Sequence, residues 1–333
     1  MALHPDVKRP VGGAKQMHRL AECIESANRE AFIIQGDADF HPSWFSSSVK
    51  TVAYESWKQR SDLHPERDIV ILPETFLSSL SSYMPGFPTV IFNQNVSYSF
   101  GVTQITQNPL RVLSTYSSDS ISHVLCVSQH DLAVLRDGFA LDQSRISLVV
   151  NAIETGMFRP AKRKKRQIAF MPRKNSLDAS VVCALLSRQE WFKGWSFVPI
   201  QNATLQEVSQ IFSESLIFLS FGHPEGFGLP VAEAFASGCC VIGYSGLGGR
   251  ELFSLAATFD VSFEIAFGDW LGFVNAVKSV VSRVDAVPQQ LMSELQQSSE
   301  LFIKTYSFDA MRCSVISAIQ SIESRLLLQY FSS

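Results

Sequence analysis

The stretch from His223 to Glu251 reads HPEGFGLPVAEAFASGCCVIGYSGLGGRE and organises the second half of the chain. It follows an apolar run, residues 216–219, of the kind that forms a buried parallel strand. Gly226 and Gly228 then predict a loop whose backbone can approach a ligand closely. A glycine loop that opens a helix leaves free N–H groups and the positive end of the helix dipole above it. The stretch therefore predicts an anion-binding loop at the end of a strand.

Two carboxylates bracket this loop and the helix that follows it. The helix is expected to begin near Leu229 or Pro230, because proline is tolerated in a first turn, and to end at Gly238. Glu225 precedes the loop and Glu233 lies inside the helix. Carboxylates would repel phosphates, so these two favour contacts with sugar hydroxyls. Taken singly, Glu225 could complement the helix dipole and Glu233 could be a surface acid.

The composition excludes some classes of partner. With 333 residues, of which 46% are hydrophobic, the chain is long enough for two domains with sizeable cores. A net charge of −3 gives no reason to expect nucleic acid as a partner. No HExxH string or Cys/His cluster suggests a metal.

Several features favour the cytoplasm as the location. The N-terminus lacks the basic and apolar regions of a signal peptide. No apolar run approaches the roughly 18 residues of a membrane span. The six cysteines have no CxxC or regular spacing and are interpreted as reduced thiols.

Strands and helices alternate along both halves of the chain. Each expected strand is a nearly continuous apolar run, which is typical of parallel sheets covered by helices on both faces. The strands are expected at 31–34, 50–54, 68–73, 88–92, 124–128 and 146–150, and then at 167–171, 196–200, 216–219 and 239–242. Largely helical stretches near 263–284, 288–303 and 308–330 end the chain. Ligands of such sheets lie at the carboxyl ends of the strands, where the glycine loop is expected.

A change of composition marks the domain boundary. Residues 151–160 have turn chemistry and lead into the basic run Lys162–Arg166. We place the boundary after Pro160. The basic run is either a solvated linker or a weak attraction to an anionic membrane surface, worth about 1 kcal/mol per charge.

The two glutamates belong to a longer string, EGFGLPVAEAFASG from Glu225 to Gly238. This string resembles the E-x7-E signature of retaining GT-B glycosyltransferases, particularly family 4. Shorter segments along most of the chain are similar to other parts of the family's pattern: Gly12-Gly13, Val127-Ser128, residues 150–160 and Tyr306-Ser307-Phe308.

The resemblance implies an α/β protein with two Rossmann-like domains whose parallel sheets face each other across a cleft. Residues 1–160 would form the acceptor-side domain, joined by a last helix at about 308–333 that crosses back to it. Residues 161–307 would bind the nucleotide sugar. The resemblance also implies sugar transfer with retention of anomeric configuration and without a cofactor or metal.

By the same resemblance, the donor half of the site lies around Glu225. Glu233 would hold the ribose hydroxyls, and Glu225 would orient the donor sugar or stabilise positive charge at its anomeric carbon. Backbone N–H groups would hold the diphosphate, from Gly226, Phe227, Gly228 and Leu229. Arg173 and Lys174 would neutralise it as it leaves. The family spaces these two cations about five residues apart, so Lys174 could point away here.

Other residues have less distinctive roles in the resemblance. Gly12 and Gly13 would approach the donor phosphate or the acceptor from the first domain, and Ile200 would flank the base. Phe227 either packs the loop or contacts the ligand. The pair Gly248-Gly249 is either a simple turn or a second loop beside the diphosphate.

The chain departs from the family after the strand at 88–92. Many relatives carry a histidine there, whereas this chain has Asn93, Gln94 and Asn95. We expect these amides to contact the acceptor or the sugar, but an amide is no general base near neutral pH. This suits a front-face mechanism, in which the donor's own phosphate takes the acceptor proton.

Further residues leave alternatives open. The family's first strand is longer, and Met1-Ala2-Leu3 supplies only its last few residues. His223 either touches the donor sugar or faces water. Tyr98 and Phe100 either line the acceptor side or belong to the core.

The function expected from the resemblance is a metal-independent retaining glycosyltransferase of the cytoplasm, at most peripheral to the inner face of the membrane. Its partners would be a nucleotide sugar donor of the UDP, GDP or dTDP type and a glycan or glycolipid acceptor, as in polysaccharide biosynthesis. One alternative is a non-catalytic GT-B module that binds a sugar nucleotide or supports a partner transferase. Another is an epimerase or phosphorylase on the same fold.

Overall fold

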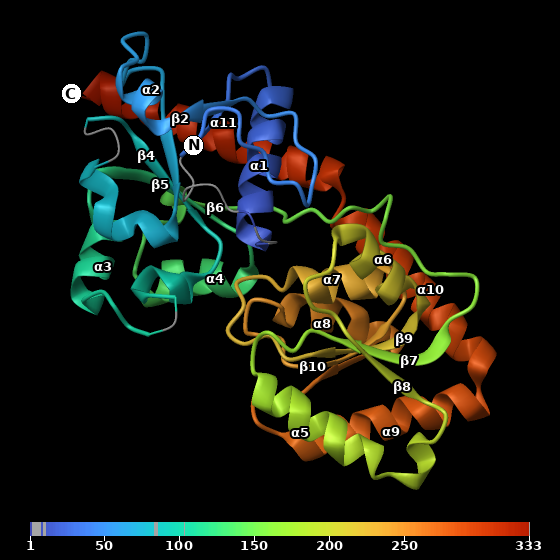
Figure 1. The fold of residues 1–333 in the computed structure, drawn as a ribbon. Coiled ribbons are helices and arrows are strands. Elements are labelled where there is room, and N and C mark those ends of the chain that lie inside the picture. The colour runs from blue at the N-terminus through green and yellow to red at the C-terminus, as the bar shows by residue number, and fades with distance from the viewer. Residues whose placement is uncertain (2–7, 9–10, 83–85, 103, 333) are drawn as a thin grey trace. The chain divides into compact units, whose positions relative to one another are not determined.

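The computed structural model describes residues 1, 8, 11–82, 86–102 and 104–332. The chain forms two compact units (Figure 1). The N-terminal unit consists of Met1–Ala152 and Asp309–Ser333, and the C-terminal unit consists of Ile153–Phe308. Both units are built on parallel sheets, so the expected α/β class is confirmed.

The segment before Pro160 belongs to the C-terminal unit rather than the N-terminal one. The backbone N–H of Ile153 donates to the carbonyl of Tyr306 at 3.0 Å. The carbonyl of Met157 accepts a hydrogen bond from Ser209 Oγ at 2.7 Å. These bonds tie residues 153–160 to the C-terminal unit. The change of composition after Pro160 does not reveal this attachment.

The N-terminal unit holds two parallel sheets. The larger has four strands in the order β3-β4-β5-β6, and the smaller pairs β1 with β2. The strands are β1 (Ile33–Gln35), β2 (Thr51–Ala53), β3 (Val70–Pro73), β4 (Thr89–Asn93), β5 (Ile121–Cys126) and β6 (Ile146–Leu148). The residues of β3, β4 and β5 are buried throughout, although β5 begins three residues before the apolar run expected at 124–128 and includes Ser122 and His123.

Helices and helical turns of this unit surround the sheets. They are α1 (Gly12–Ser26), α2 (Tyr54–Lys58), η1 (Glu74–Ser82), η2 (Val96–Phe100), α3 (Pro109–Ser117), α4 (Gln129–Ala133), η3 (Val134–Gly138) and η4 (Gln143–Arg145). The N-terminal amine of Met1 donates to the carbonyl of Phe32 at 2.7 Å. The expectation of a short first strand falls on Ala2 and Leu3, which lie outside the described residues.

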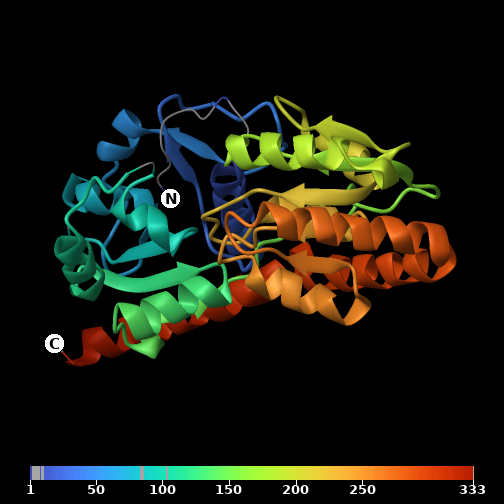
Figure 2. The ribbon, with the colours of Figure 1, turned by 90° about the horizontal axis from the view of Figure 1, so that it is seen from below.

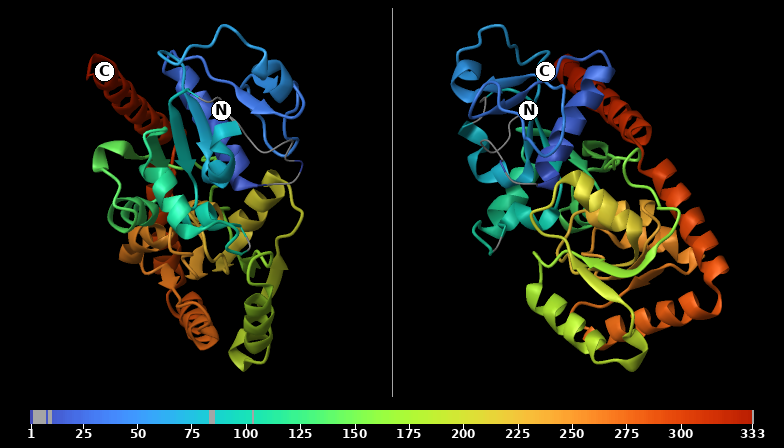
Figure 3. Two further views of the ribbon diagram at one scale, coloured as in Figure 1. Left: turned by 90° about the vertical axis from the view of Figure 1, so that its left-hand side faces the viewer. Right: turned by 45° about the vertical axis from the view of Figure 1, so that its right-hand side comes forward.

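The last helix, α11 (Phe308–Ser332), packs on the N-terminal unit, as the predicted crossing helix requires. Arg29 pairs with Glu323 at 2.7 Å, and the backbone N–H of Val150 donates to Ser314 Oγ at 3.0 Å. Figures 1 and 3 show α11 passing beside α1. Within the described residues, none of the helices is both long enough and apolar enough to cross a bilayer.

The C-terminal unit has one five-stranded parallel sheet in the order β11-β10-β9-β7-β8. The strands are β7 (Lys165–Phe170), β8 (Ser196–Pro199), β9 (Ser215–Ser220), β10 (Cys240–Gly243) and β11 (Ser262–Glu264). The helices and turns are α5 (Ser176–Ser187), η5 (Glu190–Phe192), α6 (Leu205–Glu214), α7 (Leu229–Ala236), α8 (Arg250–Ala256), η6 (Ala257–Phe259), α9 (Trp270–Ala286) and α10 (Pro288–Thr305). Helices α5 and α9 cover one face, and α6, α7 and α10 cover the other (Figures 1 and 2).

The expectation of one helical stretch over 263–284 is wrong at its start. Phe263 lies in β11, which pairs with β10, and the helix begins only at Trp270. Asp269 is the N-cap, and its side chain accepts a hydrogen bond from the N–H of Gly272 at 2.8 Å. An Asp cap after a glycine is a start signal that separates strand from helix.

The basic run contains one half-buried lysine whose ammonium is bound inside the C-terminal unit. The Lys164 ammonium donates to the carbonyls of Phe212, Ser215 and Ser237, at 3.1, 2.8 and 2.6 Å. It therefore joins the end of α6, the start of β9 and the residue after α7. Burial lowers the pKa of Lys164. The solvated-linker interpretation is thus wrong for this residue.

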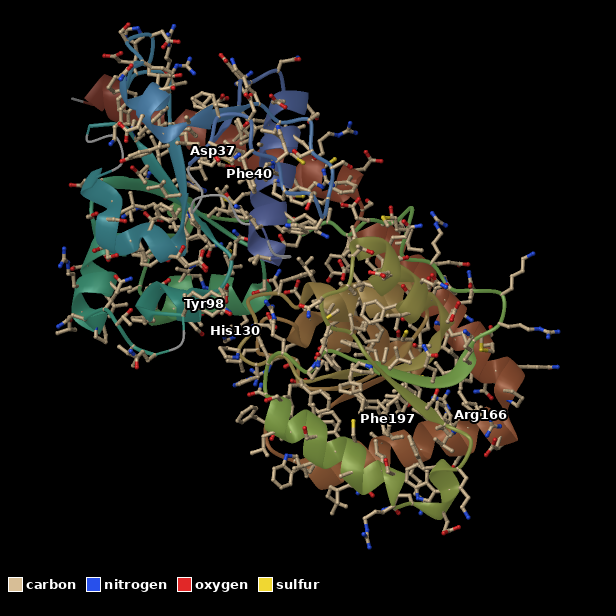
Figure 4. The ribbon with its side chains drawn as sticks, in the orientation of Figure 1. Asp37, Phe40, Tyr98, His130, Arg166 and Phe197 are labelled. Atoms are coloured by element: carbon tan, nitrogen blue, oxygen red, sulfur yellow. The ribbon has the colours of Figure 1, made fainter. Side chains whose placement is uncertain are left out.

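Its two neighbours in the run also have partners within the C-terminal unit. Lys165 pairs with Glu214, and Arg166, labelled in Figure 4, pairs with Asp285 at 2.6 Å. Only the first two residues of the run remain as exposed charges without an acidic partner among the described residues. The membrane attraction expected from five basic residues therefore rests on fewer charges.

Candidate functional site

Loops after β7, β9 and β10 meet in a pocket at the carboxyl edge of the C-terminal sheet. Six of its lining residues are Arg173, Lys174, Gly222, Glu225, Gly228 and Ser245. The structure thus brings together the two cations and the first glutamate that the sequence singled out. Parallel sheets place ligand sites at this edge because the strand ends and helix starts meet there.

The glycine loop opens α7 as the sequence predicts. Gly228 is the N-cap with φ 91°, a left-handed conformation that favours glycine, and Pro230 lies in the first turn. Within the part of the chain that the structure describes, no backbone carbonyl accepts a hydrogen bond from the N–H groups of residues 226–229. These donors at the positive end of a helix are suited to an anion.

Glu225 is fixed by both its backbone and its side chain. Its N–H donates to the carbonyl of Gly246 at 2.8 Å, and its own carbonyl accepts from the N–H of Gly248 at 3.0 Å. The carboxylate pairs with Lys174 at 2.9 Å, and Lys174 Nζ also donates to the carbonyl of Pro224 at 2.8 Å. The side chains of Lys174 and Glu225 are both half-buried. Of the adjacent cations Arg173 and Lys174, Lys174 is therefore the one that pairs with the glutamate.

The second glycine pair packs directly against the first loop. A Cβ on Gly248 would lie 2.0 Å from the carbonyl oxygen of Gly226, and one on Gly249 would lie 2.5 Å from that of Ser245. No side chain fits at such distances. The two loops therefore pack against each other as one structure, and Gly248 and Gly249 themselves lie in a turn. Whether a diphosphate lies beside them stays a prediction.

Glu233 is buried in α7, with 5% of its surface exposed, so it is no ordinary surface acid. Phe227 is 3% exposed and packs edge-on against Tyr306, with ring centroids 5.2 Å apart. The Phe227 side chain therefore packs the loop, and a donor contact would come from its backbone. The N–H of Ile200 donates to the carbonyl of Phe170 at 2.8 Å, so the predicted contact of Ile200 with a base would use its other atoms.

His223 does not simply face water. Its ring stacks on Phe267 with centroids 4.6 Å apart. Burial and the nearby Lys174 lower the pKa of His223, and Glu225 opposes them in part. Near neutral pH the ring is therefore mostly uncharged. The contact with Phe267 comes from the loop before α9 and could not be expected from sequence spacing.

Asn175 is a site residue that the sequence did not reveal. Its side-chain amide donates to the carbonyls of Phe221 and His223, at 2.8 and 3.3 Å. It adopts a left-handed conformation, φ 50°, directly before α5. Asparagine tolerates this conformation, so an Asn before a helix was the available signal.

In the N-terminal unit, the three consecutive amides after β4 have different roles. Asn93 is buried, and its side chain donates to Tyr116 Oη at 2.8 Å. Asn95 is buried and caps η2, because its Oδ1 accepts from the N–H of Ser97 at 3.1 Å. The expectation that Asn93 and Asn95 contact a substrate therefore conflicts with the internal bonds that hold both side chains.

Gln94 is the half-buried member of the three. Its side chain lies against Gly13, where a Cβ would be 3.2 Å from Gln94 Oε1. Gly12 and Gly13 are the first residues of α1, which has no side-chain cap. The structure thus brings together Gln94, Gly12 and Gly13, which the sequence had named separately.

Glu74 was missed by sequence reasoning. It directly follows β3, is 2% exposed, and its Oε2 accepts from the N–H of Gln94 at 3.0 Å. Burial raises the pKa of Glu74 to about 7, although hydrogen bonds from the backbone of Gln94 and Asn95 oppose the shift. An acid immediately after a buried strand was the signal that could have found it.

Tyr98 and His130, both labelled in Figure 4, lie in η2 and α4 and are half-buried. Phe100 packs against Phe139 with ring centroids 5.9 Å apart, beside the hydrophobic core. The core alternative therefore holds for Phe100.

No protein-family model matches the chain. The chain is 30% identical over 219 residues to the alpha-1,6-glucosyltransferase of Actinobacillus pleuropneumoniae serotype 7 (strain AP76). The match covers 62% of this chain and 59% of that protein, so the chain spans less than two thirds of the relative's length.

Solved structures are similar to nearly the whole chain. Sucrose-phosphate synthase from Thermosynechococcus elongatus has a TM-score of 0.70 at 13% identity, covering 97% of this chain and 98% of that one. Alr3699/HepE from Anabaena, in complex with UDP, has a TM-score of 0.67 at 10% identity, covering 96% and 99%. These likenesses confirm the GT-B fold.

Proposed function

We propose that this chain, which has the GT-B fold, is a retaining glycosyltransferase that moves a hexose from a nucleotide-diphosphate sugar to a hydroxyl of a glycan or glycolipid, without a metal ion. The observation that carries the proposal is the Glu225 carboxylate, held 2.9 Å from Lys174 beside the open start of α7. An acid next to an anion-binding helix start matches a substrate that has hydroxyls at one end and phosphates at the other.

The donor half of the proposed site follows from these contacts. The N–H groups of residues 226–229 and the dipole of α7 would hold the diphosphate, with Arg173 at the same pocket as a neutralising charge. Glu225 would accept hydroxyls of the donor sugar and stabilise the positive charge that develops at its anomeric carbon. Lys174 keeps the Glu225 side chain in place.

The proposed chemistry uses the donor's own phosphate as the base. The bond between the anomeric carbon and the diphosphate oxygen breaks while the acceptor oxygen attacks from the same face. The acceptor proton moves to the departing phosphate oxygen, so no protein base is required. This agrees with the amides after β4, which cannot take a proton near neutral pH.

UDP-glucose is the first donor to test. The relative from Actinobacillus pleuropneumoniae carries the name of a glucosyltransferase, and HepE from Anabaena has been solved with UDP and with UDP-glucose. The purified chain would be incubated with UDP-, GDP- and dTDP-sugars, with and without a panel of methyl glycosides. Product anomers would be identified by proton NMR. Binding of a nucleotide without hydrolysis or transfer from any donor would contradict the proposal and favour a non-catalytic module.

Removal of divalent metal is expected to leave the rate of transfer unchanged within about twofold. In the proposal, the α7 start and Arg173 stabilise the leaving diphosphate, a role that Mg²⁺ fills in other enzymes. The measurement is the initial rate in excess EDTA, and again after adding Mg²⁺ or Mn²⁺. A rate that collapses in EDTA and returns with one ion would overturn metal independence but not glycosyl transfer.

Glu233→Ala is expected to weaken UDP binding by about tenfold or more, with kcat at saturating donor changed far less. The proposal places ribose hydroxyls on this carboxylate, and a hydrogen bond to a charged group contributes about 1.5 to 3 kcal/mol. Calorimetric titration with UDP gives the dissociation constant. Glu207→Ala is the matched control, because Glu207 is an exposed acid of the α6 capping box in the same unit. Equal affinity of Glu233→Ala and wild type would remove Glu233 from the donor site.

A further inference from the structure

The turn between β4 and η2 leaves one of its three amide side chains partly exposed and binds the other two inside the N-terminal unit. The side chains of Asn93 and Asn95 make hydrogen bonds inside the N-terminal unit. Gln94 alone of the three is half-buried, with its amide beside the start of α1. A side-chain amide has both a donor and an acceptor, which is what recognition of a hydroxyl requires.

Two buried carboxylates accept hydrogen bonds from backbone N–H groups of this turn. Glu74 Oε2 accepts the N–H of Gln94 at 3.0 Å, and Asp131 Oδ2 accepts the N–H of Val96 at 3.2 Å. Glu74 is 2% exposed and Asp131 is fully buried. Among the described residues, no lysine, arginine or histidine lies within ion-pair distance of Glu74.

The lack of a counter-charge makes Glu74 unusual as a purely structural group. A buried carboxylate is costly unless cations or hydrogen bonds compensate it. Here the compensation comes from N–H groups of the turn, including that of Gln94. The position of Gln94 and the burial of Glu74 are therefore coupled.

We propose that Glu74 is a positioning residue: it fixes the backbone of Gln94 so that the Gln94 amide is presented to a hydroxyl of the acceptor. The inference rests on the proposed function, in which the pocket of the C-terminal unit takes the donor. The acceptor would then bind at the carboxyl edge of the N-terminal sheet, where Glu74 follows β3 and Gln94 follows β4.

The kinetic test uses UDP-glucose as the donor, methyl glucosides as acceptor probes and water as the competing acceptor. Glu74→Ala should raise the acceptor KM by about tenfold, the loss expected for one hydrogen bond to a charged group. The kcat, the donor KM and the rate of UDP-glucose hydrolysis should stay within about twofold, because no donor contact changes. Glu74→Gln should restore the acceptor KM, since its side-chain oxygen still accepts the N–H of Gln94.

A double-mutant cycle separates positioning from general damage. Gln94→Ala should raise the acceptor KM as much as Glu74→Ala, and the double variant should be no worse than either. Val112→Ala serves as the control for destabilisation, because it removes core volume from the same unit without removing a hydrogen bond to the turn. Additive effects, or an equal KM rise in Val112→Ala, would overturn the proposal.

Amide hydrogen exchange tests the placement without any activity. In Glu74→Ala the N–H groups of Gln94 and Asn95 should exchange faster than in wild type and in Glu74→Gln, while those of β5 remain protected. Unchanged exchange at Gln94 would overturn the inference even if the protein transfers sugar. Faster exchange in a chain that turns over no sugar nucleotide would contradict both the proposed function and the acceptor role. Glu74 would then be a structural residue only.

Discussion

Glu225→Ala is expected to lower kcat by about 10² to 10³, with the affinity for UDP almost unchanged. Removing one preorganised group that stabilises transition-state charge typically has an effect of this size. Glu225 is preorganised here because Lys174 holds its carboxylate and Gly246 and Gly248 hold its backbone. UDP lacks the sugar that Glu225 would contact, so its binding should report only on the diphosphate and ribose sites.

Steady-state rates with UDP-glucose and calorimetric titration with UDP measure the two quantities. Glu214→Ala is the matched control, since Glu214 also pairs with a lysine of the same unit but lies at the end of α6. A normal kcat in Glu225→Ala would remove this residue from the chemistry. A loss confined to UDP binding would instead move it to the nucleotide half of the site.

Gly248→Ala should lower the free energy of unfolding by about 2 to 3 kcal/mol and abolish donor binding. The added Cβ would lie 2.0 Å from the carbonyl oxygen of Gly226 and 2.7 Å from that of Glu225. Both contacts are with backbone, so the loops must separate, and overpacking of this kind costs on the order of 1 to 3 kcal/mol. Separation of the loops would also displace Glu225 and the start of α7.

Urea unfolding and UDP titration check this prediction together. Gly156→Ala is the control, because a Cβ there meets nothing within 4 Å, and its stability should stay within about 0.5 kcal/mol of wild type. Wild-type stability in Gly248→Ala would mean that the two glycine loops are not packed as described. Lost stability with normal UDP affinity would show that the paired loops support the fold but not the donor site.

Local chemistry explains why the glycine loop and α7 were predictable. Gly228, Pro230 and Gly238 each mark a boundary of α7 or its loop by their own backbone preferences. Apolar runs predict the strands before and after the helix for the same reason. The lysine contact to Glu225 was not predictable, because it joins loops after β7 and β9 that only the folded sheet brings together.

The turn after β4 was less predictable from the sequence. Asn93, Gln94 and Asn95 look equivalent in the sequence, yet the pleat of β4 and the start of η2 bury two of them. Asn93 is buried on Tyr116 and Asn95 binds the N–H of Ser97, so Gln94 is the amide that stays partly exposed. No spacing rule in the sequence predicts these two contacts. Glu74 illustrates the same limit, since an acid is rarely expected in a buried position.

Lys164 affects how this chain is compared with others. Its ammonium meets three carbonyls that converge on one point, a geometry that suits a compact charge and not the flat fork of an arginine. At Lys162 and Arg163, which are exposed, the two cations could replace each other without consequence. The basic run therefore holds one fixed lysine preceded by two interchangeable charges, and in an alignment position 164 should set the register while positions 162 and 163 should not.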